Sequence, residues 1–293
     1  MRSSWTPAGL PRLTGKRIVI TGATNGIGLH AARQLVQAGA HVVLAVRDSE
    51  LGYRRAASIG GSTSVVKVDV SRLDSVRDCA AMIEGQIDIL INNAGIMPTA
   101  HQLTIDGFES ALGTNFLGPF ALTNLLLPQV TDRVVIVGSK AHAAGRFDLR
   151  DPHFHQRTWS KKDAYTQSKL AEMLWALHLD LLLRHHNSPV KVMLAHPGWA
   201  SSNITLTGIV GIDNRLRQIG SVIANDAARG AWPTVYAAIE PIGTGSFVGP
   251  AGVLGLRGGP TLVGRAPQAC DFKMAGLVWE FAEKSTGTAL MAS

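Results

Sequence analysis

Residues 16–28 read KRIVITGATNGIG, and this stretch decides the fold. The run Lys16–Thr21 is rich in β-branched residues and predicts a buried strand, and the glycines after it predict a tight turn. Residues Ile27–Gln37 have the pattern of a helix that stops at Gly39. The stretch therefore predicts a strand, a tight turn and a helix in immediate succession.

The same alternation continues along the chain. Further strands are predicted at 41–46, 64–70, 87–92, 133–139, 190–195 and 246–249, with helical stretches near 72–84, 104–127, 163–185 and 226–239. Ser71, with Asp74 three residues later, resembles a helix N-cap box. The strand runs are almost continuously apolar, which is typical of strands covered by helices on both faces. We expect an α/β fold with a doubly wound, seven-stranded parallel sheet, the Rossmann fold.

One domain is expected over residues 1–293, because no polar linker and no fixed-period repeat divides the chain. Residues 141–162 form a long stretch rich in His, Arg and Asp before a predicted helix, and we expect a loop insert with a local function.

Composition excludes several classes of protein. Hydrophobic residues make up 46% and charged residues 17% of the chain, so a large core is expected and intrinsic disorder is excluded as the main state. The two cysteines, Cys79 and Cys270, are too few for a disulfide-dense secreted scaffold or a four-cysteine metal site.

The net charge and the N-terminal segment bear on the expected partners and the expected cellular location. The net charge is +7, but the basic residues are spread along the whole chain, so the charge favours anionic small ligands as readily as nucleic acid. We expect a small-molecule substrate and no nucleic-acid partner. Residues 1–16 lack an apolar core of an export signal, and residues 170–183 are shorter than the roughly 20 apolar residues of a membrane span and are interrupted by charges. We expect a cytoplasmic protein with no membrane span.

The turn Gly22-Ala23-Thr24-Asn25-Gly26-Ile27-Gly28 can carry chemistry. Glycines allow a ligand to approach the backbone closely, and the helix that follows offers free N–H groups and a positive dipole end to a pyrophosphate. This pattern favours a bound dinucleotide. The alternative is that the glycines serve only a tight turn and close helix–strand packing.

Arg47 follows the second strand, where the adenosine ribose of a dinucleotide lies in such a fold. A guanidinium pairs well with a 2′-phosphate, whereas an acidic residue would bind a free 2′-hydroxyl. Arg47 therefore favours NADPH over NADH, although Asp48 follows it and Arg47 could instead be a solvated loop residue. Asp69, at the end of the third strand, could accept from the adenine amino group or cap the next turn.

Polar and small residues also follow the fourth and fifth strands. Asn92-Asn93-Ala94-Gly95 comes directly after the apolar run 87–91, and Ser139 ends the fifth strand. Ligands of open α/β sheets bind outside the carboxyl ends of the strands, so these residues are expected to line the cofactor or the substrate, or to stabilise the strand ends.

Tyr165 and Lys169 are four residues apart on a predicted helix and so share one face. A nearby ammonium favours the phenolate and lowers the pKa of the phenol from its usual value of about 10, which suits proton transfer. Alone, this pair is weak evidence for an acid–base site, but its position in the chain after the preceding motifs strengthens that evidence.

Taken in order, TGATNGIG, NNAG, Asn115, Ser139 and Tyr165-xxx-Lys169 resemble the short-chain dehydrogenase/reductase superfamily over about residues 14–250, which leaves 251–293 as a C-terminal extension. LAVRD after the second strand, GSKAH around Ser139, AYTQSKLAEML and HPGWA resemble its retinol dehydrogenase branch, which is also similar to protochlorophyllide reductases.

The resemblance implies a role for each matching residue. Tyr165 is the general acid for carbonyl reduction, Ser139 hydrogen-bonds the carbonyl oxygen, Lys169 also holds the nicotinamide ribose, and Asn115 holds a water of a proton relay. The residues expected to bind the cofactor are Gly22, Thr24, Asn25, Gly26, Ile27, Gly28, Arg47, Asp69, Val70, Asn93, Ala94, Gly95, Tyr165, Lys169, Pro197, Gly198 and Ser202.

Three departures from the family pattern stand out. Gly138 lies where many members have a serine, and Ser139 and Tyr165 are about twice as far apart as in simpler members because of the insert. Ser202 lies where the family often has threonine, and its hydroxyl could still contact the carboxamide.

The expected substrate is a lipophilic alcohol, aldehyde or ketone. Phe147, Phe154 and Trp159 in the insert, Trp199 after the Pro-Gly turn and the apolar residues 204–210 suit an apolar ligand, or else pack the covering segments against the body. Two alternatives to NADP(H)-dependent carbonyl or alcohol oxidoreduction remain: reduction of a carbon–carbon double bond, and non-catalytic NADP(H) sensing.

No metal site is expected, because the histidines, including His153, His155, His185 and His186, do not have the spacing of zinc ligands. The glycosylation sequon at Asn203 should be inert without a signal peptide. The helix around 170–183 is apolar on more than one face and could join a homodimer, as the corresponding helix of the family often does.

Overall fold

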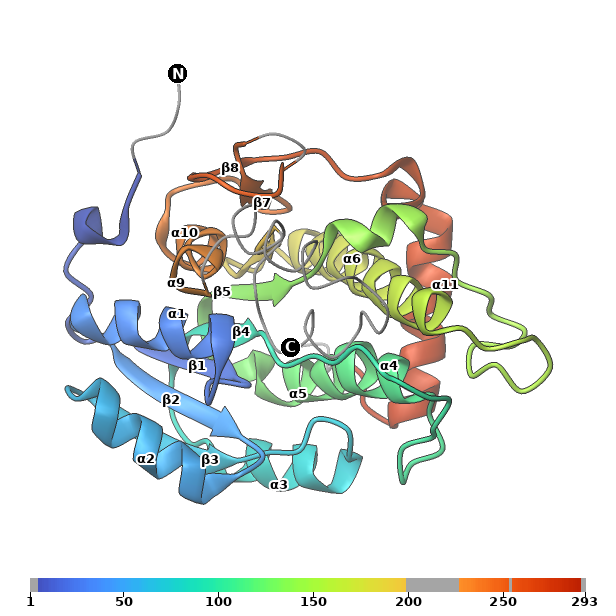
Figure 1. Cartoon of the computed structure of the whole chain (residues 1–293), viewed down its shortest axis with the longest axis horizontal. Helices are drawn as coiled ribbons and strands as arrows, with labels where there is room; N and C mark the ends of the chain where they lie inside the picture. Colours follow the sequence, from blue (N-terminus) through green and yellow to red (C-terminus); the bar gives the residue numbers. More distant parts are fainter. Residues whose placement is uncertain (1–4, 199–226, 253–254, 291–293) are drawn as a thin grey trace, which may run out of the picture.

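A computed structural model of the chain describes residues 5–198, 227–252 and 255–290. Its centre is an eight-stranded sheet in the order β3-β2-β1-β4-β5-β6-β7-β8, in which β8 alone runs antiparallel (Figure 1). The strand order reverses between β1 and β4, which is the place where ligands bind in sheets of this kind. The strands are β1 Arg17–Thr21, β2 His41–Val46, β3 Thr63–Lys67, β4 Ile87–Asn92, β5 Val130–Val137, β6 Lys191–Ala195, β7 Phe247–Pro250 and β8 Pro260–Leu262.

Helices cover both faces of the sheet. The main helices are α1 Gly26–Gln37, α2 Ser49–Ile59, α3 Leu73–Met82, α4 Ser110–Leu112, α5 Gly118–Leu126, α6 Lys161–His185, α9 Ala227–Gly230, α10 Trp232–Ile239 and α11 Phe272–Thr286. A π-helical turn, Gly113–Leu117, joins α4 to α5, and short 3-10 helices occur at Pro7–Gly9, Leu127–Gln129, Lys140–Ala144 and Pro267–Cys270.

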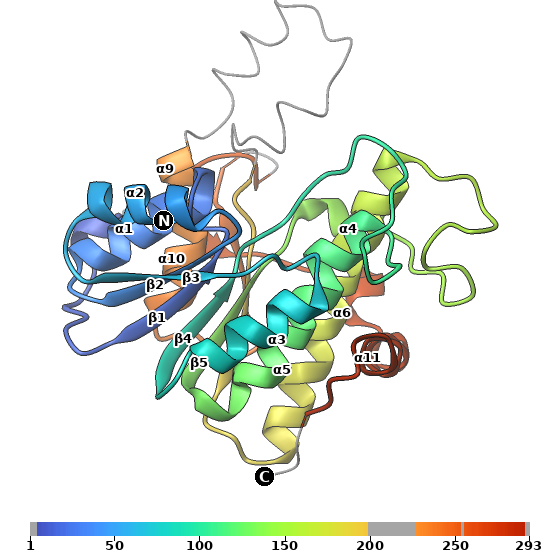
Figure 2. The same cartoon turned by 90° about the horizontal axis from the view of Figure 1, so that it is seen from below.

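Two apolar cores hold these layers together. One lies between the sheet and α1 and α10, and the other lies between the opposite face and α3, α5 and α6 (Figure 2). The central strands contribute to both cores, because successive side chains point to opposite faces. Ile18 and Ile20 of β1 face the first core, for example, and Val19 faces the second.

The register aligns the ends of the central strands. Ile20 pairs with Ile91, Asn92 with Ile136, and Val137 with Ala195. The glycine-rich turn, the Asn93-Ala94-Gly95 segment and Ser139 therefore all follow at one edge of the sheet. This is the arrangement that the sequence predicts.

The α/β fold and the seven parallel strands are confirmed, with boundaries that differ by a few residues at most. The antiparallel β8 is not among the predicted strands, because it has only three residues, directly follows Gly258 and Gly259, and carries little apolar pattern. The predicted helix near 104–127 is broken into α4, the π-helical turn and α5. Residue 226, at the start of the predicted helix 226–239, lies outside the described residues.

The predicted N-cap box at Ser71 is wrong. Helix α3 begins at Leu73 with Arg72 as its N-cap residue, and the Ser71 hydroxyl donates to Asp69 Oδ1 over 2.7 Å. The backbone N–H of Leu73 donates instead to Asp106 Oδ2, which lies 33 residues further along the chain. A long-range acceptor therefore replaces the local cap.

The C-terminal extension adds α11, which packs along α6 and also contacts α5 (Figures 1 and 2). Trp279 of α11 is buried, with its ring centroid 4.8 Å from that of Phe120. In the described ranges, no helix combines the length and the apolar character that crossing a membrane requires.

Candidate active site

The glycine-rich turn is fixed by the end of β4. The buried hydroxyl of Thr21 accepts hydrogen bonds from the backbone N–H groups of Asn93 and Ala94, both 3.0 Å long. The Asn93 side chain donates back to the carbonyl oxygen of Thr21 over 2.9 Å. The two motifs at β1 and β4 thus form one unit, in which Asn93 has a structural role.

Two glycines of the turn are required by close packing. A Cβ atom on Gly28 would lie 2.4 Å from Asn93 Nδ2 and 2.6 Å from the carbonyl oxygen of Gly22. Gly22 has φ +69° and touches the backbone of Ala94, and Gly26 has φ +54°. A side chain at these positions would strain the turn or push β4 away.

The N-terminus of α1 faces the same edge of the sheet. Its N-cap residue, Asn25, makes no side-chain capping hydrogen bond to the helix. The first N–H groups of α1 therefore keep the capacity to bind an anion, and they add the positive end of the helix dipole. These donors fit the pyrophosphate of a dinucleotide, and Gly26 and Ile27 begin the helix that supplies them.

The end of β2 carries Arg47, which is exposed and joins no hydrogen bond or ion pair within the described part of the chain. Asp48 caps α2 by accepting from the Leu51 N–H over 2.9 Å. One oxygen of its carboxylate, Oδ1, is thus engaged with the helix. Arg55 of α2 donates from Nε to the carbonyl oxygen of Thr24 over 2.9 Å and from Nη2 to Asn25 Oδ1 over 3.3 Å.

Asp69 and Val70 follow β3. Asp69 Oδ1 accepts from both the N–H and the hydroxyl of Ser71, so this carboxylate shapes its own turn. The carbonyl oxygen of Val70 lies so close to Gly118 that a Cβ atom there would overlap it. The start of α5 therefore holds the segment in which the sequence predicts the adenine contact.

Asn115 lies in the π-helical turn and is 2% exposed. Its Oδ1 accepts from the Ile96 N–H over 2.7 Å, and its Nδ2 donates to the Ile96 carbonyl and to Ser168 Oγ, each over 2.9 Å. Ser168 in turn donates to the carbonyl oxygen of Tyr165. The amide therefore ties the end of β4 to α6, and its side chain acts as a positioning group.

Ser139 follows β5 and is half-buried. Its Oγ accepts from the Ala141 N–H over 3.1 Å, which leaves the hydroxyl proton available for a ligand. His142 donates from Nδ1 to the Ser139 carbonyl and accepts from the Ala266 N–H at Nε2. Burial is the main cause that lowers the pKa of His142, so the neutral ring links the Ser139 loop to the C-terminal extension.

Tyr165 and Lys169 lie on α6 as their spacing predicts. Lys169 Nζ is 5.8 Å from the centroid of the Tyr165 ring. It donates to the Val137 carbonyl over 3.3 Å and to Glu172 Oε1 over 2.7 Å. A Cβ atom on Gly95 would lie 3.6 Å from Lys169 Nζ, so the glycine leaves room beside the ammonium.

The segment after β6 is described up to Gly198. Gly198 has φ +73° and packs against the Leu256 backbone, which explains the glycine after Pro197. His196 is buried, and its Nδ1 accepts from the Gly198 N–H over 3.1 Å. Ser202 lies outside the described residues, as do Trp199 and the apolar residues 204–210.

The aromatic residues of the insert pack against the body of the protein. Phe147 and Phe154 are 6% and 4% exposed, Phe147 lies against Phe281, and the guanidinium of Arg157 lies 3.8 Å from the centroid of the Phe154 ring. Trp159 donates to the buried carboxylate of Glu109. Phe147 and Phe154 therefore pack the insert against the body of the protein, which is the alternative to lining a substrate site.

Four residues that shape the site are not among those predicted from the sequence: Thr21, Arg55, His142 and Glu172. Thr21 and His142 act through backbone groups distant in the sequence. Arg55 lies on α2, a helix whose bounds are not predicted from the sequence. Glu172 carried a detectable signal, because an acidic residue one turn after Lys169 interrupts an apolar helix.

A family model described as short chain dehydrogenase matches residues 16–207, which is more than half of the chain. The chain belongs to the short chain dehydrogenase family. Its match contains every expected catalytic position and ends within the segment after β6.

Among curated proteins, this short chain dehydrogenase is similar to retinol dehydrogenase 13 of Homo sapiens, with 37% identity over 78% of this chain and 73% of that protein. It is also similar to polyprenol dehydrogenase of Mus musculus, with 36% identity over 82% of this chain and 76% of that protein. These relatives support the retinol dehydrogenase branch that the sequence resembles.

Solved structures agree on the fold. A crystal structure of an uncharacterized protein from Mycobacterium paratuberculosis has a TM-score of 0.87 and 41% identity, and it covers 99% of this chain and 100% of its own. The RhlG/NADP complex of Pseudomonas aeruginosa has a TM-score of 0.64 and covers 80% of this chain and 94% of its own, but at 23% identity it shows the fold alone.

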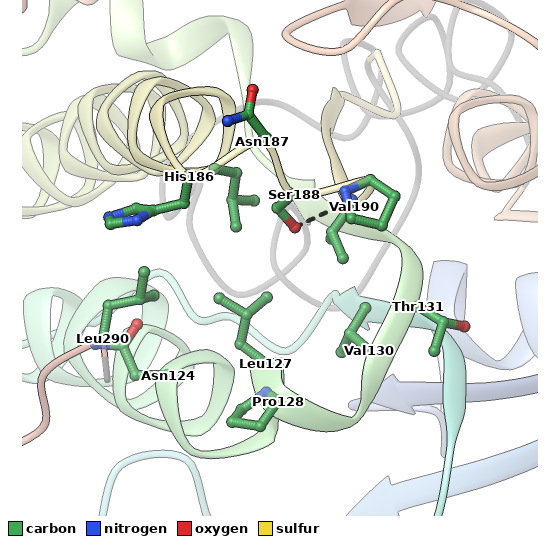
Figure 3. Close-up of a pocket in the computed structure, with 12 residues that line it drawn as sticks. Asn124, Leu127, Pro128, Val130, Thr131, His186, Asn187, Ser188, Val190 and Leu290 are labelled. Atoms are coloured by element: carbon green, nitrogen blue, oxygen red, sulfur yellow. Dashed lines mark hydrogen bonds between the residues drawn. The ribbon is translucent and has the colours of Figure 1, made fainter. Parts of the chain in front are cut away.

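In this short chain dehydrogenase, a separate cavity of about 450 Å³ lies at the edge of the sheet opposite to the candidate active site (Figure 3). Val130 at the start of β5, Leu127, Leu183 and Leu290 form its apolar wall, and His186 reaches over it from the end of α6. Ser139 follows the other end of β5, so this cavity is not the catalytic site. Within the described ranges, no group of three His, Cys, Asp or Glu side chains is placed to hold a metal ion.

Proposed function

We propose that this short chain dehydrogenase is an NADP(H)-dependent oxidoreductase that interconverts a lipophilic alcohol and its carbonyl compound. The observation that carries the proposal is the pairing of Tyr165 with Lys169 beside the space left by Gly95. Ser139 follows β5 at the same edge, and Lys169 is tied to β5 through Val137. These residues supply an acid, a hydrogen-bond donor and a cation at one place.

Each residue then has a defined task. When bound, the nicotinamide supplies or takes up the hydride. In the reducing direction, the Tyr165 hydroxyl donates a proton to the carbonyl oxygen, and the Ser139 hydroxyl donates a hydrogen bond to the same oxygen as negative charge develops on it. The Lys169 ammonium stabilises the resulting phenolate and offers a donor to the nicotinamide ribose.

The preference for NADPH rests on the end of β2. Arg47 is exposed there, and the Asp48 carboxylate is turned to the N-terminus of α2. A guanidinium without a competing acid at this position suits a 2′-phosphate. The preference for a lipophilic substrate rests on the relatives, whose names state that they are dehydrogenases of retinol and of polyprenol.

The test measures oxidation of NADPH and of NADH with a panel of apolar and polar aldehydes and ketones. We expect NADPH-preferring turnover of the apolar compounds, lowered roughly 10²- to 10⁴-fold in Tyr165→Phe. Tyr53→Phe is the matched control, because Tyr53 is 62% exposed on α2, and it should keep full activity. NADH preference would overturn the role of Arg47, and turnover of polar compounds alone would overturn the substrate class.

The same assay separates the two alternatives. A double-bond reductase would consume NADPH and leave a product that retains its carbonyl group, which product analysis detects. A nucleotide sensor would bind NADPH tightly without turnover, and Tyr165→Phe would change nothing. A cytoplasmic location and a homodimer stay predictions.

A further inference from the structure

Glu172 is buried directly behind the catalytic lysine. It lies on α6 one turn after Lys169, its side chain is 3% exposed, and its Oε1 is 2.7 Å from Lys169 Nζ. The Lys169 side chain is itself only 7% exposed. The two charges therefore form an ion pair that is almost completely shielded from water.

The contacts of Lys169 account for two of the three N–H donors of its ammonium group. An ammonium has three N–H donors. One points to Glu172 Oε1 and another to the Val137 carbonyl at the end of β5. The third remains for the side on which Tyr165 and the open space beside Gly95 lie.

The second carboxylate oxygen of Glu172 bears on what the ion pair contributes to stability. Oε2 is buried and accepts no hydrogen bond from any described residue. A buried ion pair with an unsatisfied oxygen generally adds little to folding stability compared with an apolar pair. Burial also raises the pKa of Glu172 to about 7, although Lys169 opposes this rise.

Each partner depends on the other for its charge. Burial by itself would lower the pKa of Lys169, but the nearby charges of Glu172 and Tyr165 outweigh it and raise that pKa. Lys169 is the one charged group of the described chain that acts on Glu172. On the other side of the carboxylate lie Gly138 and Met173, which are uncharged.

We propose that Glu172 is a positioning residue, which holds the Lys169 ammonium against the end of β5 and keeps it charged and directed towards Tyr165. This rests on the proposed function of Lys169. Glu172 acts through the lysine and needs no contact with substrate or cofactor.

The first test compares pH profiles of kcat/KM for wild type, Glu172→Gln and Glu172→Asp. Glu172→Gln keeps the shape but removes the charge, so the pKa of the buried lysine falls. We expect at least a tenfold loss of kcat/KM and a basic limb that moves down by at least one pH unit, with partial rescue in Glu172→Asp. A lower Tm with an unmoved pH profile would mean a purely structural role and overturn the proposal.

Gly138 offers a matched pair of variants that avoids disturbing the ion pair. A Cβ atom there would lie 3.5 Å from Met173 Sδ and 3.6 Å from Glu172 Oε2, so both alanine and serine fit. Gly138→Ser adds a donor within reach of the unsatisfied Oε2, which favours the carboxylate and moves the acidic limb of the profile to lower pH. Gly138→Ala adds the same carbon without the donor and should leave that limb in place. Equal profiles for the two variants would contradict the proposal.

A readout without turnover separates this proposal from the proposed function. If wild type and Lys169→Ala turn over the substrate panel equally, the proposed function fails. The titration of Lys169 can still be followed by NMR of protein labelled at the lysine side chains, with the signal assigned from its loss in Lys169→Ala. A lower lysine pKa in Glu172→Gln supports the role of Glu172, and an unchanged pKa overturns it.

Discussion

Arg55 on α2 lies against the glycine-rich turn, with its Nε 2.9 Å from the carbonyl oxygen of Thr24. A second donor, Nη2, reaches Asn25 Oδ1. The same helix is capped by Asp48, which directly follows Arg47. Helix α2 therefore joins the expected 2′-phosphate position to the expected pyrophosphate position, and we expect the two arginines to have different tasks.

Substitution of these arginines should separate the two tasks. Arg47→Ala should raise the Kd for NADPH roughly 10- to 100-fold and leave the Kd for NADH unchanged, because only the 2′-phosphate contact is lost. Arg55→Ala should raise both Kd values roughly two- to tenfold, because it loosens the turn that both cofactors need. Protein-fluorescence titration with each cofactor measures this. A loss of discrimination in Arg55→Ala alone would assign the phosphate contact to Arg55.

Local signals in the sequence predict only part of this fold and of the candidate site. Strands such as β1 and β4 were predictable because apolar runs followed by glycine or asparagine are local signals. The spacing of Tyr165 and Lys169 was predictable because both lie on one helix. By contrast, Thr21 acts on a segment 72 residues away, and Arg55 acts through a contact that only the packed fold creates. The weak strand β8 depends on its pairing with β7.

Asn115 should affect catalysis through its position. Asn115→Ala removes the hydrogen-bond partners of the Ile96 N–H and carbonyl and the amide that donates to Ser168 Oγ, and a group left unpaired in a buried site costs about 1–3 kcal/mol. We expect a lower free energy of unfolding and at least a tenfold lower kcat, because Ser168 contacts the Tyr165 backbone. Urea unfolding and steady-state kinetics measure the two effects.

Asn124 provides the control for that variant. It is a buried asparagine on α5, and its Nδ2 is 3.5 Å from the Thr288 carbonyl, away from Tyr165. Asn124→Ala should lower stability slightly and leave kcat unchanged. A kcat loss that merely follows stability in both variants would reduce Asn115 to a folding role.

Trp279 should decide how firmly α11 is held on α6. Its ring packs edge-to-face on Phe120, with centroids 4.8 Å apart, and lies 5.1 Å from the ring of His178. Trp279→Ala should cost about 3–5 kcal/mol of unfolding free energy, whereas Phe272→Ala, at a residue that is 60% exposed, should cost less than about 0.5 kcal/mol. Chemical denaturation checks this difference.

The same variant bears on the oligomeric state. A homodimer through α6 would compete with α11 for the face on which Trp279 packs. The predicted homodimer is therefore expected to use another surface, so light scattering should give the same oligomeric state for the intact chain and for Trp279→Ala. A dimer that appears only in Trp279→Ala would show that the face under α11 can make the contact.

His196 should contribute to acid unfolding. Burial, assisted by Lys140 and His142, lowers the pKa of His196 to about 4, below the usual value near 6.5. Its stabilisation is thus complete above pH 6.5 and is lost as the pH falls towards 4, by at most about 3 kcal/mol. His196→Asn keeps an acceptor for the Gly198 N–H but cannot titrate, so its unfolding free energy should fall less steeply over this range in urea titrations. Parallel slopes for variant and wild type would show that another group controls acid unfolding.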